Sequence, residues 1–249
     1  MRRVCTILAR AGSVGVPGKN VRDLAGIPLV AHSIRHARSS GLFSAVVVST
    51  DDPKVIEIAQ DERVDHVVHR PKELASDTSP KLPALQHAVE NAESTLGERF
   101  AVVVDLQPTS PLRVPEDIHR VVEMLESGPR SHNVVTGCRS HKSPYFDVVQ
   151  SDGDEFVRLV APPGPDGPVV RRQDAPITYD LNGSIYGWWR DALMSAREVI
   201  GPRTRLCEMP AERSVDIDSK LDFRVAEFLH EFLHSSGPED AVRTGSEVR

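Results

Sequence analysis

The sequence predicts an α/β fold in which helices cover both faces of a mostly parallel sheet. Short, continuously apolar segments alternate along the chain with longer segments whose apolar residues recur at helical spacing. Strands that are apolar at consecutive positions are typical of a parallel sheet, because such a sheet is buried on both faces. The 249 residues, 39% of them hydrophobic, are enough for one domain of this kind. We expect that single domain to span residues 1–234.

The first half of the chain carries this alternation most clearly. Strands are expected over residues 4–9, 45–50 and 100–106, with a short one near residue 67. Helices are expected over residues 28–41, 53–60, 82–93 and 115–126. Gly41 suits the end of the first helix, because glycine readily adopts the left-handed backbone that often follows a helix. Pro115 suits the first turn of the fourth helix, where its missing N–H breaks no hydrogen bond.

An excursion from the sheet is expected after residue 135, where the alternation stops. Residues 146–150 and 156–160 predict a hairpin, since the turn residues Ser-Asp-Gly-Asp separate them. Residues 161–168 are rich in proline and glycine and predict a loop. We therefore place a small inserted region at about residues 139–180, of the kind that forms a lid or a dimer contact.

Regular structure is expected to resume in the last quarter of the chain. Strands over residues 184–188 and 205–209 should precede a final helix that Ser219 caps. That helix carries large apolar side chains on one face, namely those of Leu221, Val225, Phe228 and Phe232. Residues 235–249 are polar and predict a disordered tail.

Composition argues against several classes of protein. The formal net charge of -6 argues against a nucleic-acid partner. The three cysteines are odd in number and lack metal-ligand spacing, so neither a disulfide framework nor a zinc site is expected. The sequence contains no run of about 18 apolar residues, so no membrane span is expected. The N-terminus also lacks the long apolar region of a signal peptide. We expect a cytoplasmic protein that does not bind membranes.

The loop over residues 10–20 is the most informative stretch. Three glycines at every third position let backbone amides approach an anion closely, and Arg10 and Lys19 bracket them with two cations. The loop does not match the Walker pattern, which needs glycine in place of Ser13 and serine or threonine in place of Asn20. A flexible surface loop is the alternative. The loop over residues 10–20 follows the carboxyl end of the first strand, and this position favours a triphosphate site over a flexible surface loop.

Two carboxylates lie close together near the C-terminus. Asp216 and Asp218 are two residues apart, and in an extended segment this spacing puts both on one face. Paired carboxylates suit a hard cation such as Mg²⁺, which would bridge them to substrate phosphates. The alternative is a solvated strand end in which Asp218 helps to start the last helix.

Four further segments complete a set of six motifs. They are residues 69–78 (HRPKELASDT), 106–113 (LQPTSPLR), 171–174 (RRQD) and 181–186 (LNGSIY). In this order, from about Val4 to Leu229, the motifs resemble the acylneuraminate cytidylyltransferase family, the CMP-sialic acid synthetases. The resemblance implies a Rossmann-like nucleotide-diphosphosugar transferase fold. It also implies a homodimer in which the inserted region reaches across to the partner.

The resemblance implies a reaction and a role for individual residues. CTP and a 2-keto-3-deoxy sugar acid, a sialic acid-like nonulosonate, would give the CMP-sugar acid and pyrophosphate, with Mg²⁺ or Mn²⁺ as cofactor. The residues implied for the nucleotide are Arg10, Ala11, Gly12, Ser13, Lys19, Asn20, Arg70, Ala75, Ser76 and Asp77. Those implied for the acceptor are Gln107, Arg172, Gln173 and Tyr186, and those for the metal are Asp216 and Asp218. Arg10, Lys19 and Asp216 are implied to be catalytic.

Alternatives remain open at several of these positions. The alternative for Arg172 is a surface cation in a charged loop, and that for Tyr186 is a core aromatic with a hydrogen-bonded hydroxyl. Val14 stands where the family usually has a lysine, so an octulosonate or a small phosphonate is an alternative acceptor. A nucleotide-binding subunit without activity is a further alternative. Lys19 and the aspartate pair argue against it, because a binding module needs no catalytic metal.

Overall fold

A seven-stranded sheet forms the centre of the computed structural model, which describes residues 1–12, 15–76, 78–128, 130–151, 153, 155–161, 169 and 171–235. The strands are β1 (Arg3–Leu8), β4 (Ala45–Thr50), β5 (His66–His69), β6 (Val102–Leu106), β7 (Asn133–Arg139), β10 (Tyr179–Trp189) and β11 (Thr204–Glu208). Their order across the sheet is β11-β7-β10-β6-β1-β4-β5. Within this sheet β10 runs antiparallel to its neighbours β6 and β7, and the other pairings are parallel. The prediction of a mostly parallel sheet is confirmed.

The register of the central strands gathers four loops at one edge of the sheet. Val4 of β1 lies opposite Ala45 of β4 on one side and Val103 of β6 on the other. Because β1, β4, β5 and β6 are parallel, their carboxyl ends meet at the same edge. The loops that follow β1, β5 and β6 contain three of the six motifs described above, over residues 10–20, 69–78 and 106–113.

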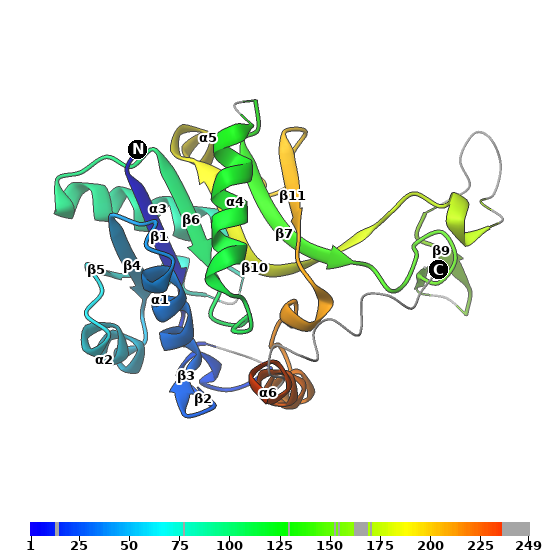
Figure 1. The fold of residues 1–249 in the computed structure, drawn as a ribbon, viewed down its shortest axis with the longest axis horizontal. Coiled ribbons are helices and arrows are strands. Elements are labelled where there is room, and N and C mark those ends of the chain that lie inside the picture. The colour runs from blue at the N-terminus through cyan, green and yellow to red at the C-terminus, as the bar shows by residue number, and fades with distance from the viewer. Residues whose placement is uncertain are drawn as a thin grey trace.

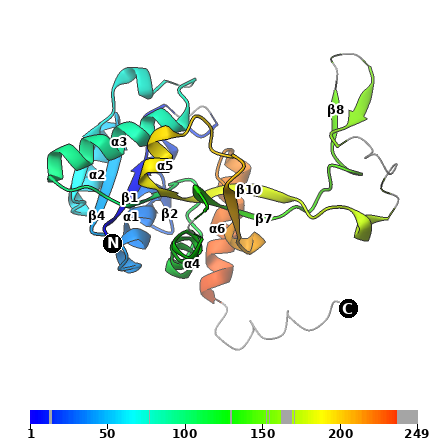
Figure 2. The same cartoon turned by 90° about the horizontal axis from the view of Figure 1, so that it is seen from above.

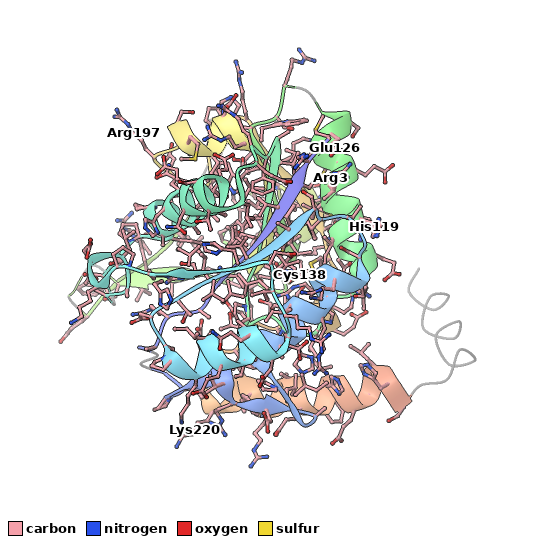
Figure 3. The ribbon with its side chains drawn as sticks, turned by 90° about the vertical axis from the view of Figure 1, so that its left-hand side faces the viewer. Arg3, His119, Glu126, Cys138, Arg197 and Lys220 are labelled. Carbon is pink, nitrogen blue, oxygen red and sulfur yellow. The ribbon has the colours of Figure 1, made fainter. Side chains whose placement is uncertain are left out.

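Helices cover both faces of the sheet (Figures 1 and 2). They are α1 (Leu29–Ser39), α2 (Pro53–Asp61), α3 (Lys81–Leu96), α4 (Pro115–Ser127), α5 (Arg190–Ser195) and α6 (Lys220–Ser235). Apolar residues of α1, α2 and α4 pack on one face, and those of α3 and α5 pack on the other. Arg3 of β1 also pairs with Glu126 of α4 through two nitrogens, at 2.7 and 3.0 Å (Figure 3).

Local signals explain where these elements begin and end. Gly41 follows α1 with φ 65°, as predicted. Asp52 accepts a hydrogen bond from the backbone N–H of Lys54 at 3.0 Å and caps α2, whose first residue is Pro53. The three cysteines are free thiols in the structure. Among the described helices, none has the length and apolar character needed to cross a bilayer.

The structure contains strands that the sequence pattern did not predict. The short β2 (Asp23–Leu24) and β3 (Ile27–Pro28) form a hairpin before α1, and β7 was not expected. β10 is also longer than the predicted strand over residues 184–188. The sequence pattern missed the first part of β10 because the register shifts between Leu181 and Tyr186, where Gly183 has φ 65°. This irregularity breaks the alternation that marks a strand in sequence.

A long arm leaves the sheet between β7 and β10 (Figure 2). At its far end β8 (Val149–Ser151) and β9 (Val157–Leu159) pair antiparallel, which confirms the predicted hairpin. Phe156, Val157 and Ile177 on this arm are exposed. Most of the predicted loop over residues 161–168 lies outside the described residues, as does the predicted tail beyond residue 235.

The last helix forms as predicted, but its apolar face is exposed. Side chains of Leu221, Val225, Phe228 and Phe232 share that face and are between 40% and 70% exposed. The helix instead packs through Phe223 and Ala226 on a separate cluster, which also contains Leu24, Leu29, Leu112 and Ile217.

Candidate active site

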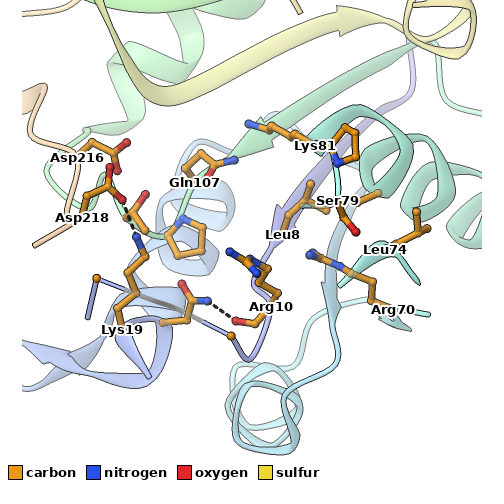
Figure 4. Close-up of a pocket in the computed structure, with 17 residues that line it drawn as sticks. Leu8, Arg10, Lys19, Arg70, Leu74, Ser79, Lys81, Gln107, Asp216 and Asp218 are labelled. Atoms are coloured by element: carbon orange, nitrogen blue, oxygen red, sulfur yellow. Dashed lines mark hydrogen bonds and ion pairs between the residues drawn. The ribbon is translucent and has the colours of Figure 1, made fainter. Parts of the chain in front are cut away.

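A cavity of about 410 Å³ lies at the edge where β1, β5 and β6 end (Figure 4). Its lining combines loop, helix and C-terminal residues: Leu8, Arg10, Gly12, Gly15, Lys19, Asn20, Arg70, Leu74, Ser79, Pro80, Lys81, Ala84, Gln107, Pro108, Thr109, Asp216 and Asp218. Cationic side chains and carboxylates therefore share one space. In a protein with a net negative charge, this local gathering of cations is what a phosphate ligand requires.

Side-chain hydrogen bonds hold the glycine-rich loop in shape. Asn20 Nδ2 donates to the carbonyl oxygen of Arg10 at 3.0 Å and so closes the loop across its base. The backbone N–H of Ala11 donates to Asp51 Oδ1 at 2.8 Å, which ties the loop to the end of β4. Gly18 has φ 63° and precedes the short 3-10 helix Lys19–Val21. This left-handed backbone favours glycine there.

The loop packs directly on the acidic segment. A Cβ atom added at Gly15 would lie 1.9 Å from the carbonyl oxygen of Asp218, so only glycine permits this approach. Lys19 Nζ donates to the carbonyl oxygen of Ile217 at 2.8 Å and to Asp218 Oδ1 at 2.9 Å. The loop and the acidic segment therefore form one wall of the cavity.

Alternation along the acidic segment puts both carboxylates in the cavity. Ile217 is fully buried in the cluster beneath α6, and its backbone N–H donates to the carbonyl oxygen of Thr109 at 2.8 Å. Asp216 and Asp218, on either side of it, both line the cavity. The predicted sharing of a face thus occurs, although the segment is extended chain and not a strand of the sheet.

Two buried polar contacts anchor the chain just before Asp216. Arg213 donates to both carboxylate oxygens of Asp117 in α4, at 2.8 and 3.0 Å. Asn182, at the irregularity in β10, donates to Ser214 Oγ at 2.9 Å. A paired guanidinium and carboxylate hold a fixed mutual orientation, so the segment has little freedom to move away from the cavity.

The environment of Asp216 fits a divalent cation. Burial raises the pKa of Asp216, and the nearby charge of Asp218 adds to the shift. Its Oδ1 is buried and has no hydrogen-bond partner within the described residues. A cation would satisfy that oxygen. Among the same residues no three potential ligands are arranged for a metal, so phosphate oxygens and water would complete the coordination of any ion.

Two buried arginines support the cavity: Arg70 lines it, and Arg113 lies behind the lining residue Gln107. Arg70, after β5, donates from Nη2 to the carbonyl oxygen of Ser49 at 2.8 Å, and burial lowers its pKa. Arg113 is fully buried and donates to Ser33 Oγ at 2.9 Å, to Ser184 Oγ at 3.0 Å and to the carbonyl oxygen of Gln107. Burial lowers the pKa of Arg113 to about 10.

The structure brings together many, but not all, of the residues singled out in the sequence. Those that line the cavity are Arg10, Gly12, Lys19, Asn20, Arg70, Gln107, Asp216 and Asp218. Ala11 and Ala75 are chain neighbours of lining residues, and the hydroxyl of Ser76 hydrogen-bonds that of the lining residue Ser79 at 2.7 Å. Tyr186 lies against Lys81. Ser13, Asp77 and the side chain of Arg172 lie outside the described residues.

Gln173 is placed elsewhere. It lines a second cavity of about 420 Å³ on the arm, together with Arg139, His141 and Thr178 among others. In this chain it is therefore not part of the cavity that holds Asp216.

Sequence reasoning missed three charged residues near the cavity: Lys81, Asp105 and Arg113. One signal for Asp105 was present, because a carboxylate interrupts an otherwise apolar strand. Its partner Lys81 had no comparable signal, because it begins a helix where a lysine is ordinary.

Several known proteins are similar to this chain. A family model described as "Cytidylyltransferase" matches residues 4–159. The chain is 35% identical to a CMP-N,N'-diacetyllegionaminic acid synthase of Campylobacter jejuni over 237 residues, which cover 95% of this chain and 98% of that protein. It is 34% identical to post-translational flagellin modification protein B of Campylobacter coli over 226 residues, 91% and 94% of the two chains. An N-acylneuraminate cytidylyltransferase of Streptococcus agalactiae is 32% identical over 225 residues, 90% of this chain and 52% of that protein.

Two solved structures share the fold. A CMP:2-keto-3-deoxy-manno-octonic acid synthetase complexed with CTP superposes with a TM-score of 0.67 at 19% identity, covering 94% of this chain and 100% of that one. The 4-diphosphocytidyl-2C-methyl-D-erythritol synthase of Anaerococcus prevotii gives 0.61 at 10% identity, covering 94% and 96%. At these identities the likeness concerns the fold alone.

Proposed function

The chain belongs to the cytidylyltransferase family, and we propose that it transfers CMP from CTP to a nonulosonate with release of pyrophosphate. One observation carries the proposal: Lys19, Asp216 and Asp218 meet in one cavity at the edge of the sheet. Such a combination suits a nucleoside triphosphate that arrives with a divalent cation. The names of the relatives, which specify CMP-diacetyllegionaminic acid and N-acylneuraminate, support a nine-carbon 2-keto sugar acid as the acceptor.

The nucleotide would occupy the side of the cavity formed by the glycine-rich loop. Arg10 and Lys19 would neutralise the triphosphate, and the backbone amide of Gly12 would lie against it. Arg70 and the segment over residues 75–77 would contact the cytosine. These assignments follow the resemblance of the motifs and the cavity that most of them share.

Asp216 and Asp218 would hold Mg²⁺ or Mn²⁺ between the protein and the phosphates. The orphaned oxygen of Asp216 and the two-carboxylate spacing support this choice. When bound, the ion would supply charge neutralisation at the α-phosphate and lower the pKa of the attacking hydroxyl.

The protein's own part in the reaction is positioning and charge stabilisation. The hydroxyl oxygen on the anomeric carbon of the acceptor forms a bond to the α-phosphorus, and the bond from that phosphorus to the pyrophosphate oxygen breaks. The hydroxyl proton is released to water. No side chain forms a covalent bond, so Lys19 and Arg10 act by neutralising the departing pyrophosphate.

We further propose a homodimer in which the arm of one protomer closes the acceptor side of its partner's cavity. The arm extends away from the sheet (Figure 2) and carries Arg172 and Gln173, of which Gln173 lines a cavity other than the one that holds Asp216. Its exposed Phe156, Val157 and Ile177 would be covered in such an assembly. Mixing an Arg172→Ala protein with an Asp216→Ala protein tests the arrangement. Activity should return in the mixed dimer if one site uses both chains, and its absence in a confirmed mixed dimer would exclude shared sites.

The proposed reaction is tested by incubating the protein with CTP, Mg²⁺ and a mixture of sugar acids, followed by mass spectrometry of the products. A CMP-nonulosonate and an equal amount of pyrophosphate are expected. Transfer to an octulosonate or a phosphonate alone would correct the acceptor. CTP binding without turnover of any acceptor would favour the non-catalytic alternative.

A further inference from the structure

A buried carboxylate joins three elements beneath one side of the cavity. Asp105 in β6 is fully buried and accepts hydrogen bonds from Thr6 Oγ1 at 3.0 Å and from Gln107 Nε2 at 3.2 Å. The ammonium of Lys81, the first residue of α3, lies 2.8 Å from its Oδ2. A pair of apolar residues would often stabilise a fold at least as well as a buried ion pair. The pair therefore points to a role in the cavity that it adjoins.

Lys81 also contacts an aromatic ring. Its Nζ lies 3.4 Å from the ring centroid of Tyr186, within the range of a cation–π interaction. Burial raises the pKa of Tyr186 to about 12, and the charges of Asp105 and Asp216 add to this shift. The phenol therefore keeps its proton at neutral pH and can donate a hydrogen bond.

The same carboxylate determines which way the amide of Gln107 faces. A carboxylate only accepts hydrogen bonds, so the NH₂ group of Gln107 must be the end that faces Asp105. Figure 4 shows the ends of Gln107 and Lys81 pointing toward one another at the wall of the cavity. The side-chain oxygen of Gln107, Oε1, is then left for the cavity that this residue lines.

We propose that Asp105 and Lys81 are positioning residues that orient Gln107 and Tyr186 toward the acceptor, so that the cavity offers a carbonyl oxygen to a hydrogen-bond donor on the sugar acid. The inference rests on the function proposed above. A hydroxyl or the N–H of an acylamino group supplies such a donor. A keto or carboxylate oxygen at that place would meet only lone pairs and bind poorly.

The test is the double variant Lys81→Met/Asp105→Leu, in which both charges are removed together. Replacing a buried pair by apolar residues of similar size usually preserves folding. The acceptor KM should rise about two- to tenfold, the range for losing a hydrogen bond between uncharged groups. The Kd for CTP, measured by calorimetry, should not change, because the pair lies on the acceptor side. An unchanged acceptor KM, or an equal rise in the Kd for CTP, would overturn the inference.

The chain offers a matched control at the other end of α3. Glu93 pairs with Arg190 at 2.8 Å, and their side chains are only 14% and 17% exposed. The variant Glu93→Leu/Arg190→Met makes the same kind of change away from the cavity. It should leave the acceptor KM unaltered. A rise as large as in the first variant would show that any loss of a buried pair in α3 produces the effect.

A second measurement needs no acceptor. In ¹⁵N-labelled protein, the side-chain amide of Gln107, assigned with Gln107→Ala, should exchange its hydrogens more slowly than in Lys81→Met/Asp105→Leu. Equal exchange would refute the orientation even if wild-type turnover fails to support the nonulosonate function. Turnover of nonulosonates by the wild type, in contrast, tests the proposed function alone.

Discussion

Acidification should destabilise the protein through one histidine of α1. The Nδ1 atom of His36 is buried and lacks a hydrogen-bond partner within the part of the chain that the structure describes. Burial lowers the pKa of His36 from 6.5 to about 3, and Arg113, His32 and His230 add to the shift. Below about pH 6.5, and down to about pH 3, His36 binds a proton in the unfolded chain but not in the folded chain. Stability from this group is therefore complete above that pH and declines as the pH falls.

The size of the effect follows from the same values. Only the unfolded chain binds the proton between the ordinary pKa of 6.5 and about pH 5, a range of about 1.5 pH units. Over this range the free energy of unfolding changes by about 1.4 kcal/mol per pH unit. The free energy of unfolding should therefore fall by about 2 kcal/mol through His36 between about pH 7.5 and pH 5.

Urea unfolding of the wild type and of His36→Leu at the two pH values measures this contribution. Other groups, including His32 and His230, titrate in both proteins, so the difference between the two losses isolates His36. The wild type should lose about 2 kcal/mol more than the variant. Equal losses in the two proteins would refute the reasoning, because His36 would then bind its proton as readily in the folded as in the unfolded state.

The active site gives three further predictions. Lys19→Ala should lower kcat about 10²–10³-fold with little change in the melting temperature, and near-normal turnover would count against its role at the phosphates. Gly15→Ala should reduce CTP turnover by pushing the loop off the carbonyl of Asp218, which lies 1.9 Å from the added Cβ; a crystal structure with an unmoved loop would contradict this. Because burial raises the pKa of Asp216, and cation binding needs the carboxylate, kcat/KM should fall on acidification at a higher pH than an ordinary aspartate would give. Metal affinity that holds constant down to the ordinary range would exclude Asp216 as the titrating ligand.

Periodicity in the sequence predicted the elements whose burial is uniform. β4 begins and ends at the predicted residues, because all six of its side chains are buried and the polar residues Ser44 and Asp51 flank it in the chain. The alternation of Asp216, Ile217 and Asp218 likewise predicted the placement of both carboxylates in one cavity. In each case the pattern depends on contacts of the segment itself with a core.

Features that depend on distant partners were not predictable in this way. The irregularity at Asn182 is held by Thr136 and Ser214, two residues on separate parts of the chain. Helical periodicity showed which residues of α6 share a face, but not that Phe223 would supply the buried contact. Asp105 and Lys81 meet because α3 begins beside the end of β6, which the spacing of motifs does not reveal.

The contact between Lys19 and Asp218 shows how the site can accept a ligand that carries both signs of charge. Without ligand, the two groups balance each other at 2.9 Å. The side chain of Asp218 is 76% exposed, so water solvates its carboxylate when the lysine turns toward a phosphate. Asp216, in contrast, is half-buried, and its own Oδ1, which has no hydrogen-bond partner within the described residues, is the oxygen that a cation would satisfy. One carboxylate can therefore exchange its partner at small cost in free energy, while the other holds a fixed position for the metal.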